Sequence, residues 1–451
     1  MTLHSQTLDD QAALLLDGAA RGAAYLRMLP DRAVSADLTT LGDLDIALPD
    51  TGLPALGVLD LIEKAGAPAT VATAAGRYFG YVIGGSLPAA SGTRAMLAAW
   101  DQIADADTGP SVIAMEKTAI RWIVDLLRLP ASCDGVFTTG ATLANVTLLA
   151  TARDELLARH GHPRGKGLIG APALRVVASA EVHATVLKSL RIIGLGSDDI
   201  EQVPVDAQGR MKADDLPDLD DRTIVIAQAG NVCTGATDPV GEIARVCQAA
   251  GSWLHVDGAF GLWARVSDRI GSALDGIEHA DSWVVDAHKT LNAPYDSGIA
   301  LCRHPEAMRA SMAIGAAYLP AKEPGPADLA PEFSRAARGA ETYAALLSLG
   351  RDGVADLVDH LHGLALRLAE GVREVGFHVP HDIHFNQVFA TLPGDPDFCA
   401  EIVAKVRESG EAWFGEASWQ GHRGFRMSVS NWSTREQDID RLIAALASAH
   451  R

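Results

Sequence analysis

Short apolar runs alternate with stretches of helical periodicity through the middle of this chain. Runs of four or five mainly apolar residues predict buried strands, because strands covered on both faces carry apolar side chains at nearly every position. Helical stretches lie between these runs, so the pattern predicts an α/β fold with a mostly parallel sheet. The strand candidates are residues 174–178, 223–227, 253–256, 282–285 and 299–302.

The two ends of the chain have different patterns. Residues 8–29 and 58–64 carry apolar positions at helical spacing, with a stretch bearing Pro and Gly between them. Near the other end, strand candidates at 386–391 and 425–429 alternate with helical stretches. The expected parts are an N-terminal helical segment (1–85), a large α/β domain (86–310), and a loop followed by a small α+β domain (311–451).

Local signals predict one long loop and one helix cap. Residues 305–330 are rich in Ala, Pro and Gly, which is typical of a surface loop, and a long helix is expected from Ser334. Thr434, followed three residues later by Gln437, predicts a capping box at the start of the last helix.

Two ionisable residues follow two of the strand candidates. Asp257 comes directly after one run and Lys289 shortly after the next. Because residues that follow parallel strands lie at the edge of the sheet where ligands bind, we expect both side chains to face one pocket. A carboxylate keeps the pyridine nitrogen of pyridoxal 5'-phosphate (PLP) protonated, and a lysine holds this cofactor as a Schiff base. The pair therefore predicts a PLP site, although each residue alone is compatible with an ordinary structural role.

A possible anion site lies earlier in the chain. Thr138-Thr-Gly-Ala-Thr142 leads into an apolar helical run, residues 143–157. The free N–H groups at a helix start, beside threonine hydroxyls, form a site for an anion, and the cofactor phosphate is the expected occupant. The alternative is an ordinary capped helix without a ligand.

Further short segments are each weak signals, but their order and spacing together are specific. These segments are Phe79-Gly-Tyr81 with Gly84-Gly85, Phe137–Asn145, Ser179–His183, Ala229–Asn231, His255–Asp257, His288-Lys289, Pro294–Asp296 and Phe425–Asn431. Over most of its length the chain thereby resembles the group II PLP-dependent amino-acid decarboxylases, which include the glutamate and aromatic L-amino-acid decarboxylases. The resemblance implies the fold-type I PLP-dependent transferase fold and a homodimer in which the N-terminal helical layer packs on the partner subunit.

The resemblance also implies an activity and residue roles. The expected enzyme removes the α-carboxylate of an L-amino acid through a lysine Schiff base and a quinonoid intermediate, with Lys289, His183 and Asp257 as catalytic residues. Arg426 is expected to bind a substrate carboxylate, and a surface salt bridge is the alternative role for this residue. The expected cofactor-binding residues are Ala141, Thr142, His183, Asn231, Asp257, Ala259, His288 and Lys289. The expected substrate-binding residues are Arg426, Tyr81 and Gly84.

One stretch departs from the family pattern. Members usually carry a loop tyrosine that returns a proton after decarboxylation, whereas Pro320 to Ser334 contains no tyrosine and Tyr318 stands just before it. Without that donor the carbanion reacts otherwise. A PLP-dependent carbon–carbon lyase (aldolase-like) or an aminotransferase on the same fold is therefore the alternative. A third hypothesis, a binding protein that has kept only the fold, is disfavoured by Asp257 and Lys289.

Composition narrows the setting. The formal net charge of −19 disfavours a nucleic-acid partner, which needs a basic face. The five cysteines show no CxxC spacing, which is typical of reduced thiols. The first twenty residues lack the features of a signal peptide, and no apolar run is long enough for a membrane span. We expect a soluble cytoplasmic enzyme with a small-molecule substrate and no membrane partner.

Other motifs are missing from the sequence. The chain has no GxxxxGK[ST] motif and no GxGxxG after a strand candidate, so a nucleotide site is not expected. His381 and His384 stand three residues apart in a predicted loop, without an HExxH motif or a cysteine partner. We therefore expect no metal site.

Overall fold

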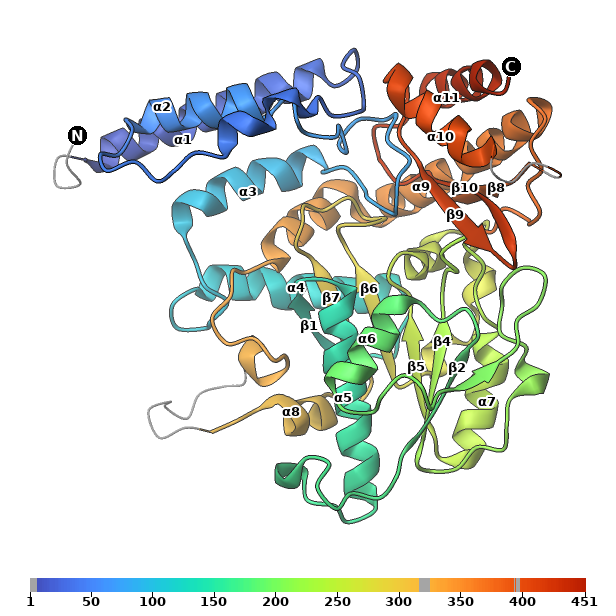
Figure 1. The fold of residues 1–451 in the computed structure, drawn as a ribbon. Helices are drawn as coiled ribbons and strands as arrows, with labels where there is room; N and C mark the ends of the chain where they lie inside the picture. The colour runs from blue at the N-terminus through green and yellow to red at the C-terminus, as the bar shows by residue number, and fades with distance from the viewer. Residues whose placement is uncertain (1–5, 316–324, 393, 395–397) are drawn as a thin grey trace.

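The computed structural model describes residues 6–315, 325–392, 394 and 398–451, and its centre is a seven-stranded sheet (Figure 1). The strands are β1 (Asp134–Thr138), β2 (Arg175–Ser179), β3 (Glu201–Val203), β4 (Thr223–Gln228), β5 (Trp253–Asp257), β6 (Ser282–Asp286) and β7 (Gly298–Cys302). Their order is β1-β7-β6-β5-β4-β2-β3. Neighbours from β6 to β3 are parallel, and β7 runs antiparallel to both β6 and β1. The mostly parallel sheet predicted from the sequence is confirmed.

Helices cover both faces of this sheet. Helices α4 (Pro110–Leu126) and α7 (Val240–Ala250) lie on one face, and α5 (Ala141–Arg159) and α6 (Ala184–Ile192) on the other. Helix α3 (Pro88–Trp100) packs on the C-terminal part, and α8 (Pro305–Met312) packs on α5. On β4, Ile224 and Ile226 share a core with α5 and α6, whereas Val225 and Ala227 share another with α4 and α7. Burial on both faces explains why these strands have continuous apolar runs.

The C-terminal part forms a second layer with its own core. Its elements are α9 (Gly339–Glu374), β8 (Gln387–Ala390), α10 (Phe398–Ser409), β9 (Gly415–Trp419), β10 (His422–Ser428) and α11 (Glu436–Ala449). The strands make an antiparallel sheet in the order β8-β10-β9. Phe79, from a segment far away in the sequence, is fully buried in the core of this layer. The expected α+β architecture is thus present, and the domain limits at 85/86 and 310/311 stay a prediction.

The N-terminal helical segment contains α1 (Leu8–Met28) and α2 (Ala55–Leu61), which lie side by side in Figure 1. Arg21 joins them, because its guanidinium lies 2.6 Å from Asp17, 2.7 Å from Asp60 and 2.6 Å from Glu63. No residue of α1 is buried. The helix therefore leaves its apolar side chains exposed in the single chain.

The predicted loop at 305–330 is wrong at its start, where α8 forms. Pro305 occupies the first turn of this helix, where the fixed φ of proline suits helical geometry, and Met308 is fully buried. Tyr318 and the first part of the stretch from Pro320 to Ser334 lie outside the described residues.

The predicted cap of the last helix is also wrong. The Thr434 hydroxyl donates to the Gly76 carbonyl at 2.9 Å, so a tertiary contact occupies it. The α11 helix begins later, at Glu436, and the Asp438 carboxylate accepts a hydrogen bond from the Arg435 N–H at 2.8 Å.

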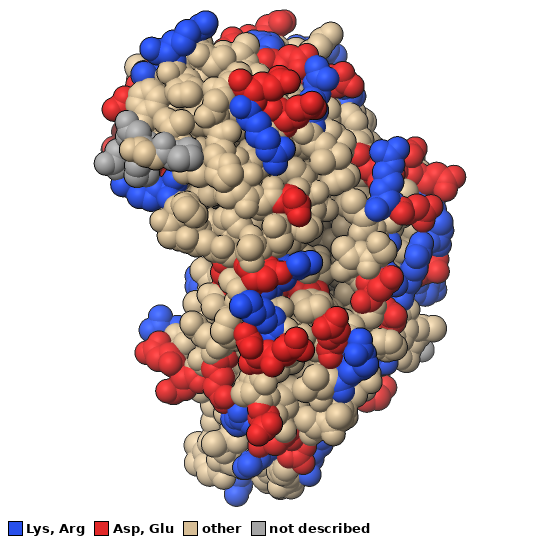
Figure 2. Space-filling model, turned by 90° about the vertical axis from the view of Figure 1, so that its right-hand side faces the viewer, with Lys and Arg blue, Asp and Glu red and all other residues tan. Residues whose placement is uncertain are grey.

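Charges are mixed on the surface seen in Figure 2, where acidic and basic side chains are interleaved without a broad basic area. The face shown therefore offers no broad basic area to a polyanion. Within the described residues, no helix combines the length and the apolar character needed to cross a bilayer.

A buried ion pair fastens α4 to the segment before α9, and it gives a stability prediction. Arg335 donates two hydrogen bonds of 2.9 Å to the Glu116 carboxylate, and both side chains are at most 5% exposed. We expect Arg335→Met to lower the free energy of unfolding by about 3–5 kcal/mol, because it leaves a buried carboxylate without its cation. Urea denaturation measures this.

Arg351 provides the control, since it pairs with Asp125 in an exposed setting. Arg351→Met should cost less than about 1 kcal/mol. Equal losses in the two variants would contradict the assigned difference in burial.

Candidate active site

A cavity of about 500 Å³ lies at the carboxyl ends of β4, β5 and β6. Its wall comes from four parts of the chain: residues 81–83, the start of α5 at 139–142, the segments that follow the strands, and Arg426 on β10. The cavity therefore lies where the large sheet, the N-terminal segment and the C-terminal layer meet.

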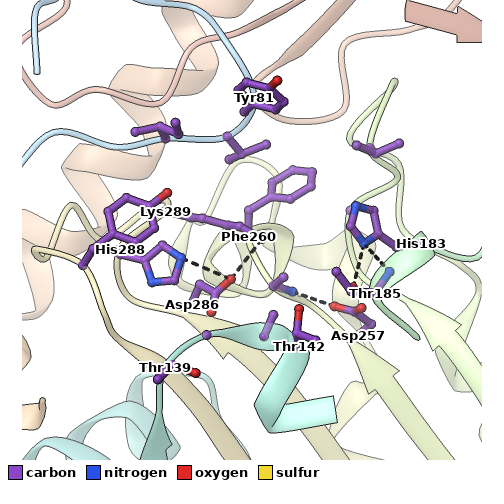
Figure 3. A pocket seen from close by; sticks show the side chains of 18 of the residues that line it. Tyr81, Thr139, Thr142, His183, Thr185, Asp257, Phe260, Asp286, His288 and Lys289 are labelled. Atoms are coloured by element: carbon purple, nitrogen blue, oxygen red, sulfur yellow. Dashed lines mark hydrogen bonds and ion pairs between the residues drawn. The ribbon is translucent and has the colours of Figure 1, made fainter. Parts of the chain in front are cut away.

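Lys289 points into this cavity, where it meets Asp286, the last residue of β6 (Figure 3). The Lys289 Nζ atom lies 3.0 Å from Oδ2 of Asp286, whose carboxylate is only 2% exposed. Among the described residues, nothing forms a hydrogen bond with the other oxygen, Oδ1. A buried carboxylate thus holds the amine in place and keeps one oxygen free for a further donor.

Asp257 ends the neighbouring strand β5 and faces the cavity on the side away from Asp286 (Figure 3). Its Oδ2 accepts a hydrogen bond from Nδ2 of Asn145 at 3.2 Å, and its Oδ1 accepts one from the Ala259 N–H at 3.2 Å. Each carboxylate oxygen of Asp257 therefore has an N–H donor that holds it in place.

The start of α5 forms the floor between these two acids. No side chain caps this 19-residue helix at Gly140, and Ala141 and Thr142 both line the cavity. The first N–H groups of a helix have no partner within the helix, and the helix dipole favours an anion beside them. This segment therefore has the properties of a phosphate cradle.

Two histidines flank the cavity as neutral rings. Burial lowers the pKa of both His183 and His288. The His183 Nδ1 lies 2.7 Å from the Thr185 Oγ1 and 3.3 Å from the Thr185 N, so Nδ1 is the ring nitrogen that Thr185 occupies. The His288 Nδ1 accepts from the Ser297 N–H at 3.2 Å, and its ring stacks on Tyr295 with centroids 4.1 Å apart.

Arg426 brings a cation to the wall of the cavity opposite the strand ends. Its Nη1 donates to the Val232 carbonyl at 2.7 Å, which fixes the guanidinium. Burial lowers the pKa of this guanidinium, but an arginine remains charged at neutral pH. Tyr81 lines the same cavity, and its ring stacks on Trp413 with centroids 5.9 Å apart.

These groups fit PLP. An amine, a carboxylate and an uncapped helix start surround one cavity, and they match the aldehyde, the pyridine nitrogen and the phosphate of this cofactor. Residues 43–391 match the family model described as the pyridoxal-dependent decarboxylase conserved domain. The chain belongs to this family. It is a PLP-dependent amino-acid decarboxylase, and hence a carboxy-lyase.

Several known proteins are similar to this decarboxylase, over part or most of its length. L-2,4-diaminobutyrate decarboxylase from Rhizobium meliloti is 29% identical over 80% of this chain and 74% of its own length. The aromatic-L-amino-acid decarboxylase of Bacillus atrophaeus is 33% identical, over 44% of this chain and 40% of its own. The 4-hydroxyphenylacetaldehyde synthase of Rhodiola rosea is 26% identical over 74% of this chain and 72% of its own. The solved structure of Oryza sativa TDC with PLP and tryptamine covers 99% of both chains at a TM-score of 0.90 and 21% identity, which confirms the fold.

Most residues predicted from the sequence line the cavity of this decarboxylase. They are Tyr81, Ala141, Thr142, His183, Asp257, Ala259, His288, Lys289 and Arg426. Asn231 lies outside the lining: its amide donates to Glu181 at 2.7 Å, and its oxygen accepts from the Cys233 N–H at 2.9 Å. These bonds direct the Asn231 side chain into the turn that it belongs to, so the structure does not bring this side chain to the cavity.

Gly84 also lies outside the lining, and it packs against the Lys289 carbonyl and the Asn292 side chain. A Cβ atom at this position would lie 2.2 Å from the Lys289 carbonyl oxygen. The loop that carries Gly84 therefore packs directly on the turn that carries the lysine, and only glycine permits this approach.

Asn292, which the sequence analysis missed, fastens that contact. Its side-chain oxygen accepts from the N–H groups of Gly85 at 2.7 Å and Trp432 at 2.9 Å. Its amide donates to the carbonyls of Thr290 at 2.8 Å and Ser430 at 2.9 Å. Asp286, Asn145 and Thr185 were missed as well. For Asn145, a polar residue within an apolar helical run was the available signal.

Gly84→Ala tests this packing. We expect it to lower the free energy of unfolding by about 1–3 kcal/mol, because the new methyl group must displace the lysine turn, and to weaken PLP binding. Urea denaturation and PLP titration measure the two effects. The control is Gly92→Ala on α3, where a Cβ has no neighbour within 4 Å. That change should stabilise the protein by about 0.5–1 kcal/mol, and a loss in the control like that in Gly84→Ala would refute the steric explanation.

Proposed function

We propose that Lys289 holds PLP and Asp257 contacts its pyridine nitrogen, and that this site removes the α-carboxylate of an L-amino acid. The supporting observation is that the two side chains enter one cavity from the ends of adjacent parallel strands, with the uncapped start of α5 between them.

The residues of the chain divide the work among them. Bound PLP supplies the sink for the electron pair that remains on Cα when carbon dioxide leaves. Asp257 holds a proton at the ring nitrogen, and the N–H groups at Ala141 and Thr142 bind the phosphate beside His288. His183 would lie against the bound ring, and its Nε2 would hold a proton toward the reacting carbon, since its Nδ1 is occupied by Thr185.

Arg426 is proposed to bind a substrate carboxylate. Its guanidinium faces the cavity and can present a planar pair of donors, which suits a carboxylate. Tyr81 and its neighbours Val82 and Ile83 form the adjacent wall and contact the substrate side chain. This wall mixes a phenol with apolar groups.

A second outcome of the reaction has its own support. The stretch from Pro320 to Ser334 contains no tyrosine. A relative covering 74% of this chain is named an aldehyde synthase. The alternative to simple decarboxylation is therefore that the carbanion reacts in another way than by protonation to the amine, as it does in a carbon–carbon lyase or an aminotransferase.

The proposed setting is a cytoplasmic homodimer. All five cysteines are free, which suits a reducing compartment. The exposed apolar side chains of α1 and α2 include Leu16 at 71% and Leu56 at 54%. Such a surface favours burial against a second copy of the chain.

The function is tested by adding L-amino acids one at a time and measuring carbon dioxide, amine, aldehyde, keto acid and pyridoxamine phosphate. We expect one amine for each carbon dioxide with the true substrate. Borohydride reduction followed by peptide mapping should place the phosphopyridoxyl group on Lys289. Lys289→Ala should abolish both the release of carbon dioxide and the phosphopyridoxyl label. Lys117→Ala, on the exposed side of α4, should change neither of them. A label on another lysine contradicts the assignment, and aldehyde or keto acid in place of amine supports the alternative.

Arg426→Gln is expected to weaken substrate capture by about 2–5 kcal/mol in kcat/KM, because a desolvated ion pair loses its cation, while PLP absorbance stays intact. The matched change is Arg367→Gln, which removes an exposed salt bridge to Asp440. Steady-state kinetics compare the two variants. Unchanged kinetics in Arg426→Gln would contradict substrate binding by Arg426 and would leave this residue a structural role.

Light scattering after gel filtration tests the dimer. We expect twice the chain mass for the wild type, and a concentration-dependent shift toward the monomer for Leu16→Glu, because it places a charge in the apolar surface. Leu366→Glu alters an exposed leucine on α9 and should leave the mass unchanged. A monomeric wild type would contradict the proposal.

A further inference from the structure

A line of four buried side chains leads away from Asp257 into the protein. Side chains alternate along a strand, so Trp253, His255 and Asp257 share one face of β5. Helix α5 supplies Asn145, and β6 supplies Ser282, which pairs in register with His255. Trp253, Ser282, His255 and Asn145 are all 0% exposed.

Consecutive hydrogen bonds connect these side chains. The Trp253 Nε1 lies 3.0 Å from the Ser282 Oγ, which lies 2.8 Å from the His255 Nδ1. The His255 Nε2 lies 2.8 Å from the Asn145 Oδ1, and the Asn145 Nδ2 lies 3.2 Å from Oδ2 of Asp257. The chain of bonds therefore ends on the carboxylate that faces the cavity.

The chemistry of the two ends fixes the direction of every bond. At one end a carboxylate accepts, so the Asn145 amide donates to Asp257 and the Asn145 oxygen accepts from the His255 Nε2–H. At the other end an indole N–H only donates, so the Ser282 oxygen accepts from Trp253, and the Ser282 hydroxyl donates to Nδ1 of the neutral His255 ring. Burial lowers the pKa of His255 to about 4, so the ring is neutral and its single proton lies on Nε2. This proton goes to the Asn145 oxygen, which leaves the Asn145 amide to donate to Asp257.

We propose that Trp253, Ser282, His255 and Asn145 are positioning residues that hold the Asp257 carboxylate directed at the pyridine nitrogen of PLP. Hydrogen bonds that run in one direction polarise each other, so the last donor is stronger than an isolated amide. A reversed Asn145 amide would point its oxygen at the carboxylate and repel it. The inference rests on the proposed role of Asp257.

The test compares PLP with an analogue in which carbon replaces the ring nitrogen. Asn145→Ala and His255→Leu should weaken PLP binding by about ten- to a hundredfold, as outer partners of a ligand site do. The analogue has no nitrogen for Asp257 to contact, so its dissociation constant should stay within about threefold of the wild-type value. Thr151→Ala removes a buried hydroxyl from the same helix, outside the chain of bonds, and should change neither constant.

Two further variants separate a positioning role from a packing role. His255→Gln keeps an N–H near the Nε2 position and should recover most of the PLP affinity that His255→Leu loses. Ser282→Ala removes a single hydroxyl and should weaken PLP binding by about two- to tenfold even if the larger changes prevent folding. Thermal melting of each cofactor-free variant verifies the fold.

The outcomes are distinct. Equal losses for PLP and the analogue, or no loss of PLP affinity, overturn the positioning role. Histidine ¹⁵N spectra should show the His255 proton on Nε2, and a proton on Nδ1 overturns the direction of the bonds. If the wild-type protein fails to bind PLP, the proposed function itself is contradicted. This result is obtained with the wild-type protein, before any variant is made.

Discussion

The active site depends on the buried amide of Asn292, which joins its own turn, the one that carries Lys289, to two segments that are distant in the sequence. Its hydrogen bonds reach the loop at Gly85, the lysine turn at Lys289 and Thr290, and the C-terminal segment at Ser430 and Trp432. Each bond left unmade in the interior costs about 1–3 kcal/mol. The three segments are therefore stable only in one mutual arrangement, and the cavity that they enclose inherits this rigidity.

The two buried carboxylates of the cavity have different hydrogen-bond partners, so the two sides of the cavity differ in their electrostatic environment. Asp257 receives two N–H donors, whereas Asp286 has the Lys289 amine on one oxygen and an open second oxygen. The chain as a whole is strongly acidic. An anionic cofactor is therefore favoured only by local groups, above all the N–H groups at the start of α5, which act at short range against the overall field.

The sequence predicted what local patterns encode. Continuous apolar runs located the buried central strands to within about a residue, and the residues that follow them were expected at one edge of the sheet. Strand β3 has only three residues and β1 begins with Asp134 and Gly135, so neither produces an apolar run. The opposite direction of β7 is set by its neighbours rather than by its own residues. Asn145 and Asn292 were missed because their partners lie more than a hundred positions away.

Gly84 has a consequence for how the substrate range of such an enzyme changes over evolutionary time. Its backbone touches the lysine turn so closely that no side chain is tolerated there, and Gly85 next to it is committed to Asn292. Adaptation to a new substrate is therefore channelled into the preceding positions, Tyr81 to Ile83, which line the cavity without supporting Lys289. In this short loop, the positions that line the cavity can therefore change during evolution, whereas the two glycines must be preserved.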